Sequence, residues 1–202
     1  MDKSNDLVSP LTKGPVKFLF NISQNFISDL YLTEANIDVS NYFIHIEEVS
    51  VYECIETGYR FFYPFNLYGD GKFYEQLEEF SWYYADWKWD YEVAQDFIQS
   101  KSKILDIGCG EGKFLDYLSK NKACIISGLE LNEKARQIAS SKNIAVLNEL
   151  IQDHAIENKE KYDIVTFFQV LEHISDVNTF LQSAKESVKK GTSKDVSFFD
   201  NY

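Results

Sequence analysis

The spacing of apolar residues divides the chain into two parts. Within residues 16–79, apolar and polar residues alternate, most clearly in IHIEEVSVYE (44–53), and this alternation predicts half-buried strands. From Tyr91 onward, short apolar runs alternate with stretches whose apolar residues recur at helical spacing. Strands that alternate with helices in this way form βαβ units with a parallel sheet. We therefore expect a β-rich N-terminal segment followed by an α/β domain.

The same patterns set the expected boundaries. They predict a flexible polar tail over 1–15, a β-rich accessory segment over 16–79 and an α/β domain over 80–202, with helices on both faces of its sheet. The expected strands of this domain are KILDI (103–107), CIISGLE (124–130), IAVL (144–147) and YDIVTFF (162–168), and the expected helices begin at Tyr91 and cover 113–120, 132–141 and 176–190.

Composition narrows the classes of partner. The 202 residues are 45% hydrophobic, which is typical of a globular protein, and the formal net charge is −12. Because this charge repels phosphate backbones and anionic lipids, neither nucleic acid nor membrane is expected as a partner. The three cysteines, Cys54, Cys109 and Cys124, show no paired spacing, and the N-terminus has no apolar core of signal-peptide length. We therefore expect free thiols and a cytoplasmic location.

A glycine-rich turn follows the first strand of the α/β domain. In ILDIGCGEG (104–112), glycines stand at 108, 110 and 112, and Asp106 precedes the first of them by two positions. Glycines between a strand and a helix let the backbone approach a ligand closely, with helix N–H groups directed at it. Glu130 stands at the end of the next expected strand, where a carboxylate can accept hydrogen bonds from both ribose hydroxyls of an adenosine ligand. The pattern predicts a nucleoside-containing cofactor.

Three motifs together resemble the class I S-adenosylmethionine-dependent methyltransferases of the small-molecule type. LDIGCGEG (105–112) is similar to the first motif of that family, GLELN (128–132) to its ribose-binding motif, and YDIVTFFQVLEHI (162–174) to its fourth motif. The resemblance covers about residues 80–191. It implies a Rossmann-like sheet, S-adenosyl-L-methionine as cofactor and a small-molecule substrate.

The resemblance also assigns expected site residues. Gly108 and Gly110 would let the backbone face the cofactor, Glu130 would hold its ribose, and the backbone carbonyl of Gln169 would meet its ammonium group. His173, with Glu172 beside it, is the expected catalytic base, because histidine titrates near neutrality; the alternative is that His173 caps or packs against the next helix. The other expected cofactor contacts are Asp106, Cys109 (through its backbone), Leu131, Asn148 and Glu149, with Leu150 as a further candidate for the adenine slot.

A stretch rich in aromatic residues, FSWYYADWKWDY (80–91), precedes the glycine motif and contains every tryptophan of the chain. Aromatic faces attract a sulfonium by cation–π interaction and also stack on ring-shaped acceptors. Tyr83 and Tyr84 are the expected cofactor contacts in this stretch. The alternative is an apolar hinge between the two parts of the chain.

Upstream, YECIETGYRFFYP (52–64) resembles a segment that reads C-x-x-C-G and binds zinc in related methyltransferases. Here Thr57 stands where the second cysteine would be, so the segment offers one thiolate from Cys54. A tetrahedral site needs four ligands. We therefore expect no metal and a β-rich remnant of the module. Relatives with this layout imply a saccharide-linked acceptor.

The C-terminal part departs from the family pattern. The family's sheet has seven strands and the chain offers about four, so the expected fold is an incomplete Rossmann-like sheet in a truncated domain. The fourth strand would then form an edge, which a homo-oligomer or a sheet-completing partner would cover. Three functions stay open: a methyltransferase that is active or has become inactive through the truncation, a non-catalytic module that binds the cofactor or a partner, and a nicotinamide-dependent oxidoreductase. The G-x-G-x-G spacing disfavours the last, which uses G-x-G-x-x-G.

Overall fold

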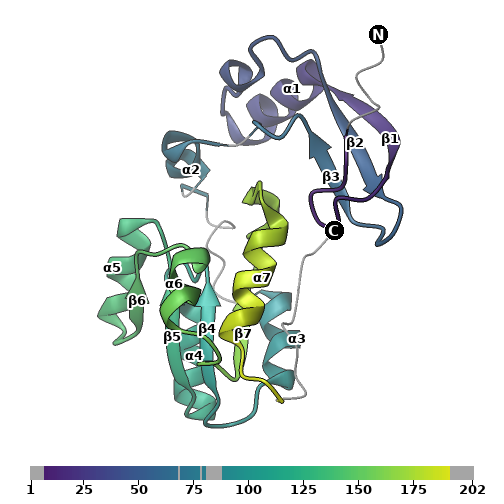
Figure 1. Cartoon of the computed structure of the whole chain (residues 1–202). Coiled ribbons are helices and arrows are strands. Elements are labelled where there is room, and N and C mark those ends of the chain that lie inside the picture. Colours follow the sequence, from purple (N-terminus) through teal and green to yellow (C-terminus); the bar gives the residue numbers. More distant parts are fainter. Residues whose placement is uncertain (1–6, 68, 78, 81–87, 192–202) are drawn as a thin grey trace. The chain divides into compact units, whose positions relative to one another are not determined.

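The structure is a computed structural model that describes residues 7–67, 69–77, 79–80 and 88–191. The chain separates into two compact units, residues 1–83 and 84–202 (Figure 1). The residues expected over the cofactor, Tyr83 and Tyr84, lie outside the described residues.

The N-terminal unit contains an antiparallel sheet in the order β1-β2-β3. Ser23 caps the helix that follows the first strand, because its side chain accepts the amide proton of Asn25. A small apolar core of Ile37, Val39 and Leu77 lies outside the sheet. The elements of this unit are β1 (Val16–Ser23), α1 (Gln24–Ala35), η2 (Ser40–Phe43), β2 (Glu48–Cys54), β3 (Arg60–Tyr63) and α2 (Gly71–Leu77).

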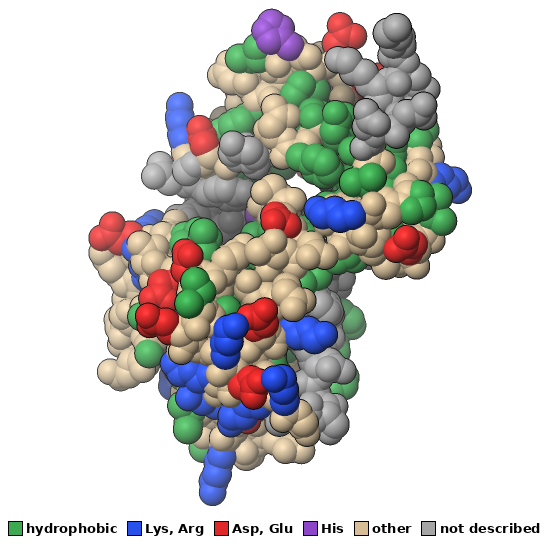
Figure 2. All heavy atoms as spheres, in the orientation of Figure 1, with side chains coloured by type: hydrophobic (Ala, Val, Ile, Leu, Met, Phe, Trp, Pro, Cys, Tyr) green, Lys and Arg blue, Asp and Glu red, His purple; other side chains and the backbone are tan. Residues whose placement is uncertain are grey.

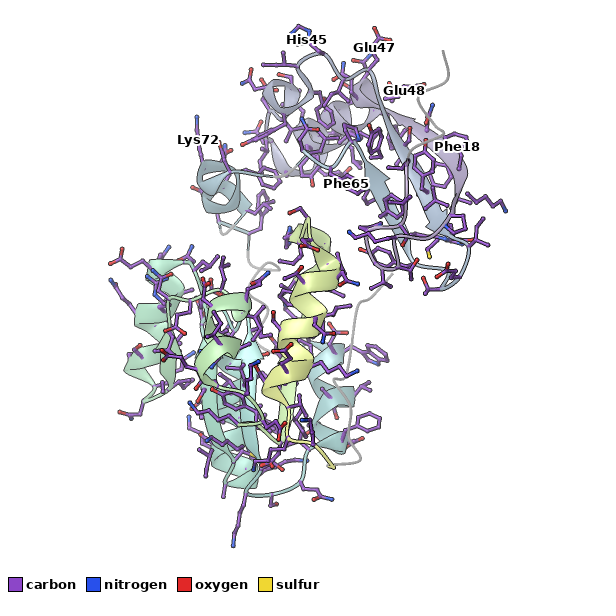
Figure 3. The ribbon with its side chains drawn as sticks, in the orientation of Figure 1. Phe18, His45, Glu47, Glu48, Phe65 and Lys72 are labelled. Atoms are coloured by element: carbon purple, nitrogen blue, oxygen red, sulfur yellow. The ribbon has the colours of Figure 1, made fainter. Side chains whose placement is uncertain are left out.

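One face of the N-terminal sheet carries an array of aromatic rings. Phe18, Tyr52 and Phe61 stand in register on the three strands, so their side chains share a face. Phe61 stacks on Phe65, which follows β3, with ring centroids 5.6 Å apart. Figure 3 labels Phe18 and Phe65 of this array. Apolar side chains are also gathered on the face of this unit that Figure 2 shows. The rings of Phe18, Tyr52 and Phe61 therefore pack on one another across the sheet.

Residues 7–15 correct the expectation of a loose tail. They form a turn in which Ser9 is fully buried, and the carbonyl of Pro15 accepts the amide proton of Ile55 at 3.1 Å. Polar composition suggested flexibility, but here the polar groups form hydrogen bonds within the fold.

The C-terminal unit is a parallel four-stranded sheet in the order β6-β5-β4-β7 with helices on both faces, which confirms the expected incomplete Rossmann-like sheet (Figure 1). The short helix α6 was not expected from the sequence, because one of its three buried positions is the polar His154. The elements are α3 (Trp89–Phe97), β4 (Lys103–Ile107), α4 (Lys113–Lys122), β5 (Ile125–Leu129), α5 (Glu133–Ser141), β6 (Ala145–Leu147), α6 (Ile151–Glu157), β7 (Ile164–Phe167), η3 (Leu171–His173) and α7 (Val177–Ser187).

Alternate residues of the central strands enter two separate cores. Ile104 of β4 packs with α3, α4 and α5, whereas Leu105 packs with α6 and α7 on the other face. Both residues are fully buried, as a strand covered on two sides requires. The two layers of helices hold the carboxyl ends of β4, β5 and β7 in fixed positions along one edge of the sheet.

The outer edge of β7 is only partly paired. Among the described residues, β7 pairs along its length with β4, and the opposite side of the chain is met just before the strand, where Tyr162 forms a parallel bridge with Val188. The side chains of β7 are nevertheless buried on both faces, including Val165 at 0% exposure and Phe167 at 2%. What β7 exposes is therefore backbone rather than apolar side chains.

Candidate active site

The glycine-rich turn links β4 to α4 at the carboxyl edge of the sheet. Gly108, Gly110 and Gly112 all adopt positive φ angles, of 68°, 53° and 73°. A Cβ atom at Gly108 would lie 2.7 Å from Cγ2 of Val170, and one at Gly112 would lie 2.5 Å from Cδ1 of Ile144. The turn thus needs glycine both for its backbone conformation and for the close approach of its neighbours.

The turn is tied to the end of β5. The amides of Gly108 and Cys109 both donate to the carbonyl of Leu129, at 2.8 and 3.1 Å. Burial raises the pKa of the Cys109 thiol well above its usual range, so this side chain is a neutral, packed group. A Cβ atom at Gly128 would lie 2.4 Å from the Cys109 sulfur, so glycine is needed there as well.

Glu130 joins the glycine turn to the turn after β5. One carboxylate oxygen accepts the amide proton of Gly110 at 2.8 Å, and the other accepts that of Asn132 at 2.8 Å. The structure therefore brings together two residues, Gly110 and Glu130, that the sequence assigned to one site. Hydrogen bonds from backbone amides to a carboxylate also fix the orientation of that carboxylate.

Asp106 lies beneath the glycine turn and is 2% exposed. Burial raises its pKa to about 7, while a hydrogen bond from Thr166 Oγ1, at 2.8 Å, acts in the opposite direction. The negative charge of Glu130 adds to the rise and the positive charge of Lys88 opposes it. Thr166, on β7, was not expected in the site: it lies within the fourth motif, but a threonine inside an apolar strand carries no ligand signal of its own.

Two charged residues of the aromatic stretch also reach this edge. Lys88 Nζ donates to the side-chain oxygen of Gln169 at 2.6 Å, and Gln169 itself has a positive φ of 54°. Burial lowers the pKa of Lys88, and the nearby charges of Asp90, Asp106 and Glu172 oppose that change. A non-glycine residue with positive φ is common at functional sites. Lys88 was not among the expected site residues, because the expectation for residues 80–91 rested on their aromatic side chains.

Asp90 is the second charged residue that the sequence analysis missed. It is 1% exposed, and neither of its carboxylate oxygens has a hydrogen-bond partner among the described residues. Burial raises its pKa, with Lys88 acting in the opposite direction. An unpaired carboxylate is costly to bury, so a donor group supplied by a ligand would stabilise it.

The expected catalytic pair lies just beyond β7, on η3. The Nε2 atom of His173 lies 3.9 Å from a carboxylate oxygen of Glu172, and the two side chains are 47% and 38% exposed. The pair therefore lies at the carboxyl edge and is accessible to a molecule from solution. A role of His173 and Glu172 as acid or base stays a prediction.

The residues expected around adenine follow β5 and β6. Leu131 and Leu150 are 59% and 49% exposed. The side-chain oxygen of Asn148 accepts a hydrogen bond from Arg136 at 3.3 Å. Glu149 is engaged elsewhere: its carboxylate contacts Nδ1 of the buried His154 at 2.8 Å. Leu131 and Asn148 thus remain near the end of β5, while Glu149 is held toward α6.

A cavity of about 630 Å³ lies away from the glycine turn. Its lining includes Ser127, Leu147, His154 and Tyr162, from β5, β6, α6 and the start of the β7 segment. Of the expected site residues it contains only Glu149. The cavity is therefore separate from the site built around Gly110 and Glu130.

Among the described residues, no three His, Cys, Asp or Glu side chains lie close enough together to hold a metal ion. No helix of the described part of the chain is long and apolar enough to cross a membrane.

Residues 82–194, more than half of the chain, match the model of a family described as a methyltransferase domain. The chain belongs to this methyltransferase family. S-Adenosyl-L-methionine is the cofactor that membership implies. The residues at the carboxyl edge fit this group: the glycine turn allows close approach, Glu130 presents a carboxylate, and Asp90 is a buried carboxylate that no other described residue hydrogen-bonds.

The chain is also similar to individual curated proteins. It is 31% identical over 108 residues to a ubiquinone biosynthesis O-methyltransferase from Vibrio vulnificus. The matched region covers 48% of this chain and 46% of that protein. A protein of the same name from Serratia proteamaculans is 31% identical over 94 residues, covering 44% of this chain and 39% of its own length. The chain thus spans less than half the length of these relatives.

The chain also resembles solved structures at low sequence identity. A SAM-dependent methyltransferase from Thermotoga maritima is 20% identical, with a TM-score of 0.48, and covers 59% of this chain and 55% of its own. A SAM-dependent methyltransferase from Archaeoglobus fulgidus is 22% identical, with a TM-score of 0.43, and covers 50% of this chain and 47% of its own.

Proposed function

We propose that the C-terminal unit binds S-adenosyl-L-methionine along the carboxyl ends of β5, β4 and β7 and transfers its methyl group to a small molecule. The observation that carries the proposal is the pair of 2.8 Å hydrogen bonds by which Glu130 joins Gly110 to Asn132. These bonds hold a carboxylate beside a glycine turn, which is the arrangement that a ribose and its neighbouring backbone contacts require.

Different residues of the site contact different parts of the cofactor in this proposal. Glu130 accepts hydrogen bonds from the ribose hydroxyls, and Leu131 and Asn148 border the adenine. The glycine turn faces the ribose and methionine parts, with Asp106 supporting it from below. Gln169 offers its carbonyl to the ammonium group of the methionine part.

Asp90 and Lys88 complete the methionine end of this assignment. The unpaired carboxylate of Asp90 suits the ammonium group, and the ammonium of Lys88 suits the methionine carboxylate. The two side chains already influence each other electrostatically. They thus form an oppositely charged pair that matches a zwitterionic ligand.

The reaction places modest demands on the protein. The bound cofactor supplies a methyl group on an electrophilic sulfonium, so the protein must mainly align the acceptor and remove its proton. His173 is the proposed base, with Glu172 3.9 Å away to favour the protonated imidazole that results.

The acceptor is proposed to be a hydroxyl group of a small molecule. The names of the curated relatives, ubiquinone biosynthesis O-methyltransferases, support oxygen as the methylated atom. A saccharide-linked hydroxyl is compatible with this class and remains a narrower alternative. A second copy of the chain or another partner is proposed to add a strand at the outer edge of β7.

Two measurements test the proposed function. Calorimetric titration with S-adenosylhomocysteine should show binding in the micromolar range. Transfer of a labelled methyl group should then be measured with a panel of phenols, catechols and sugars, for the wild-type chain and for His173→Gln. We expect the variant to keep cofactor affinity and to lose roughly 10²–10⁴-fold in turnover.

Each outcome has a distinct meaning. Cofactor binding without transfer to any acceptor would support the non-catalytic module instead. Absence of binding by the wild-type chain would refute the proposed site. Titration with NADH serves as the control for the oxidoreductase alternative, and we expect no binding.

A further inference from the structure

Two turns of the N-terminal unit, turn 9–14 and turn 54–59, have the same hydrogen-bond pattern. In each, the amide of the first residue donates to the carbonyl of the sixth, and the amide of the fifth donates back to the carbonyl of the first. The amide of the sixth residue donates to the hydroxyl of the fourth. The distances are 2.9, 2.9 and 3.1 Å in turn 9–14 (Ser9–Gly14, Lys13–Ser9, Gly14–Thr12 Oγ1) and 2.7, 2.8 and 3.2 Å in turn 54–59 (Cys54–Tyr59, Gly58–Cys54, Tyr59–Thr57 Oγ1).

The backbone conformations of the two turns also agree. The fifth residue of each has a positive φ, of 59° at Lys13 and 74° at Gly58. A lysine in this conformation is uncommon, because its Cβ atom makes the left-handed region unfavourable. Its presence in turn 9–14 indicates that the surrounding hydrogen bonds determine the shape of the turn.

The two turns face each other across the end of the β1–β2 pair, in which Val16 is opposite Cys54. Thr12 Oγ1 lies 3.5 Å from the sulfur of Cys54. Ser9 and Cys54, the first residues of the two turns, are both fully buried. The hydroxyls of Ser9 and Thr57, like that of Thr12, form hydrogen bonds with the Cys54 thiol. Four side chains, two from each turn, thus converge on one point.

This arrangement has the spacing of a metal-binding knuckle pair. Structural zinc sites commonly take two ligands from each of two short loops, with two residues between the ligands of a loop. Positions 9 and 12 and positions 54 and 57 reproduce that spacing twice. Only the second pair can be recognised in the sequence, because serine and threonine at 9 and 12 carry no metal-ligand signal.

We propose that turns 9–14 and 54–59 form a knuckle pair whose four ligand positions are occupied by one thiol and three hydroxyls, so that hydrogen bonds to the Cys54 sulfur replace a tetrahedral metal ion. Neutral hydroxyls are poor ligands for Zn²⁺, which selects thiolate and imidazole. The knuckle pair should therefore bind Zn²⁺ only after its three hydroxyl residues are replaced by cysteine.

The first test restores the ligands. The full-length triple variant Ser9→Cys, Thr12→Cys, Thr57→Cys is prepared with and without zinc in the refolding buffer. Metal analysis should find about one equivalent of zinc, and Co²⁺ should give the absorption of a tetrahedral thiolate site. The wild-type chain should hold less than about one tenth of an equivalent, since a single thiolate cannot retain the ion.

A matched control keeps the number of cysteines and moves one of them. In Ser9→Cys, Thr12→Cys, Glu56→Cys, the third new thiol stands one residue before the ligand position. We expect zinc to bind this control at least about 10-fold more weakly, because one ligand lies outside the tetrahedral set. Equal affinity in the two triple variants would overturn the assignment, as would a full equivalent of zinc in the wild-type chain.

The second test removes single hydroxyls and requires no new metal site. Thr12→Val and Thr57→Val should each lower the melting temperature of the chain by several degrees, because each removes a hydroxyl that bonds both to the Cys54 sulfur and to a backbone amide of its own turn. An unchanged melting temperature in both variants would refute the hydrogen-bonded replacement of the metal, whatever the triple variants show.

Discussion

Replacing Glu130 by alanine gives the sharpest test of the cofactor site. The carboxylate holds two backbone amides, those of Gly110 and Asn132, at 2.8 Å each. In the proposed complex it also accepts hydrogen bonds from the ribose. Hydrogen bonds to a charged group contribute about 1.5–3 kcal/mol each in favourable cases, and less where water can replace the lost partner. Because Glu130 is partly exposed, we expect a total loss of about 1–3 kcal/mol in binding, which is roughly a 5- to 150-fold weaker Kd.

Calorimetric titration with S-adenosylhomocysteine measures this change. Glu130→Gln should bind with intermediate affinity, because its amide keeps one acceptor oxygen in nearly the same place. Glu133→Ala is the matched control: it removes the same charge from an exposed position three residues away, and its affinity should match the wild type within about twofold.

Thermal melting of each variant separates loss of binding from loss of folding. An unchanged Kd in Glu130→Ala, in a chain that melts as the wild type does, would show that the carboxylate does not contact the cofactor. A Kd that weakens equally in Glu133→Ala would show that the effect is one of overall charge.

Three further predictions concern the same unit. Burial raises the pKa of Asp106 from its ordinary 3.8 to about 7, so the folded state binds this proton more tightly than the unfolded state does. The stability of the wild-type chain relative to Asp106→Asn should therefore fall as pH rises from about 4 to 7. A difference in melting temperature between the two chains that is constant over this range would contradict the burial argument. Lys88→Met should weaken S-adenosylhomocysteine by about 10-fold in calorimetry and leave adenosine within about twofold, because adenosine lacks the methionine carboxylate; equal losses for both ligands would exclude the proposed contact. The partly paired edge of β7 should make the chain self-associate, so that light scattering after size-exclusion chromatography shows a mass that rises with concentration, whereas a monomer at every concentration would argue against a sheet-completing partner.

Local patterns were sufficient for the order of the strands and of the longer helices in the C-terminal unit, but not for the short helix α6 or for η3. Each strand there is a short apolar run, and the residues that determine it are neighbours in sequence. The glycine turn could be predicted for the same reason, since 108–112 directly joins a strand to a helix. Glu130 could be placed because parallel strands bring their carboxyl ends to one edge of the sheet. The sequence therefore determined the fold class and the centre of the candidate site.

Contacts between distant segments were decided by the tertiary structure alone. Thr166 reaches Asp106 because the two residues are register partners in the β4–β7 pair. Lys88 reaches Gln169 because the fold brings the start of α3 to the end of β7. Neither contact leaves a periodic or spaced signal in the sequence. The unpaired carboxylate of Asp90 could not be foreseen either, because burial depends on what the rest of the chain places around a residue.

The N-terminal unit shows the same division most clearly. Alternation of apolar and polar residues predicted strands there, and the spacing of Cys54 and Thr57 suggested a module without its metal. Polar composition suggested that residues 1–15 would be loose, yet turn 9–14 is folded against turn 54–59. The pairing of β1 with β2 brings Ser9 to Cys54, 45 positions along the chain. The sequence determines which hydroxyls and thiol are present, but only the pairing of the strands decides that they meet, because hydrogen bonds between them depend on distance in space and not on distance in sequence.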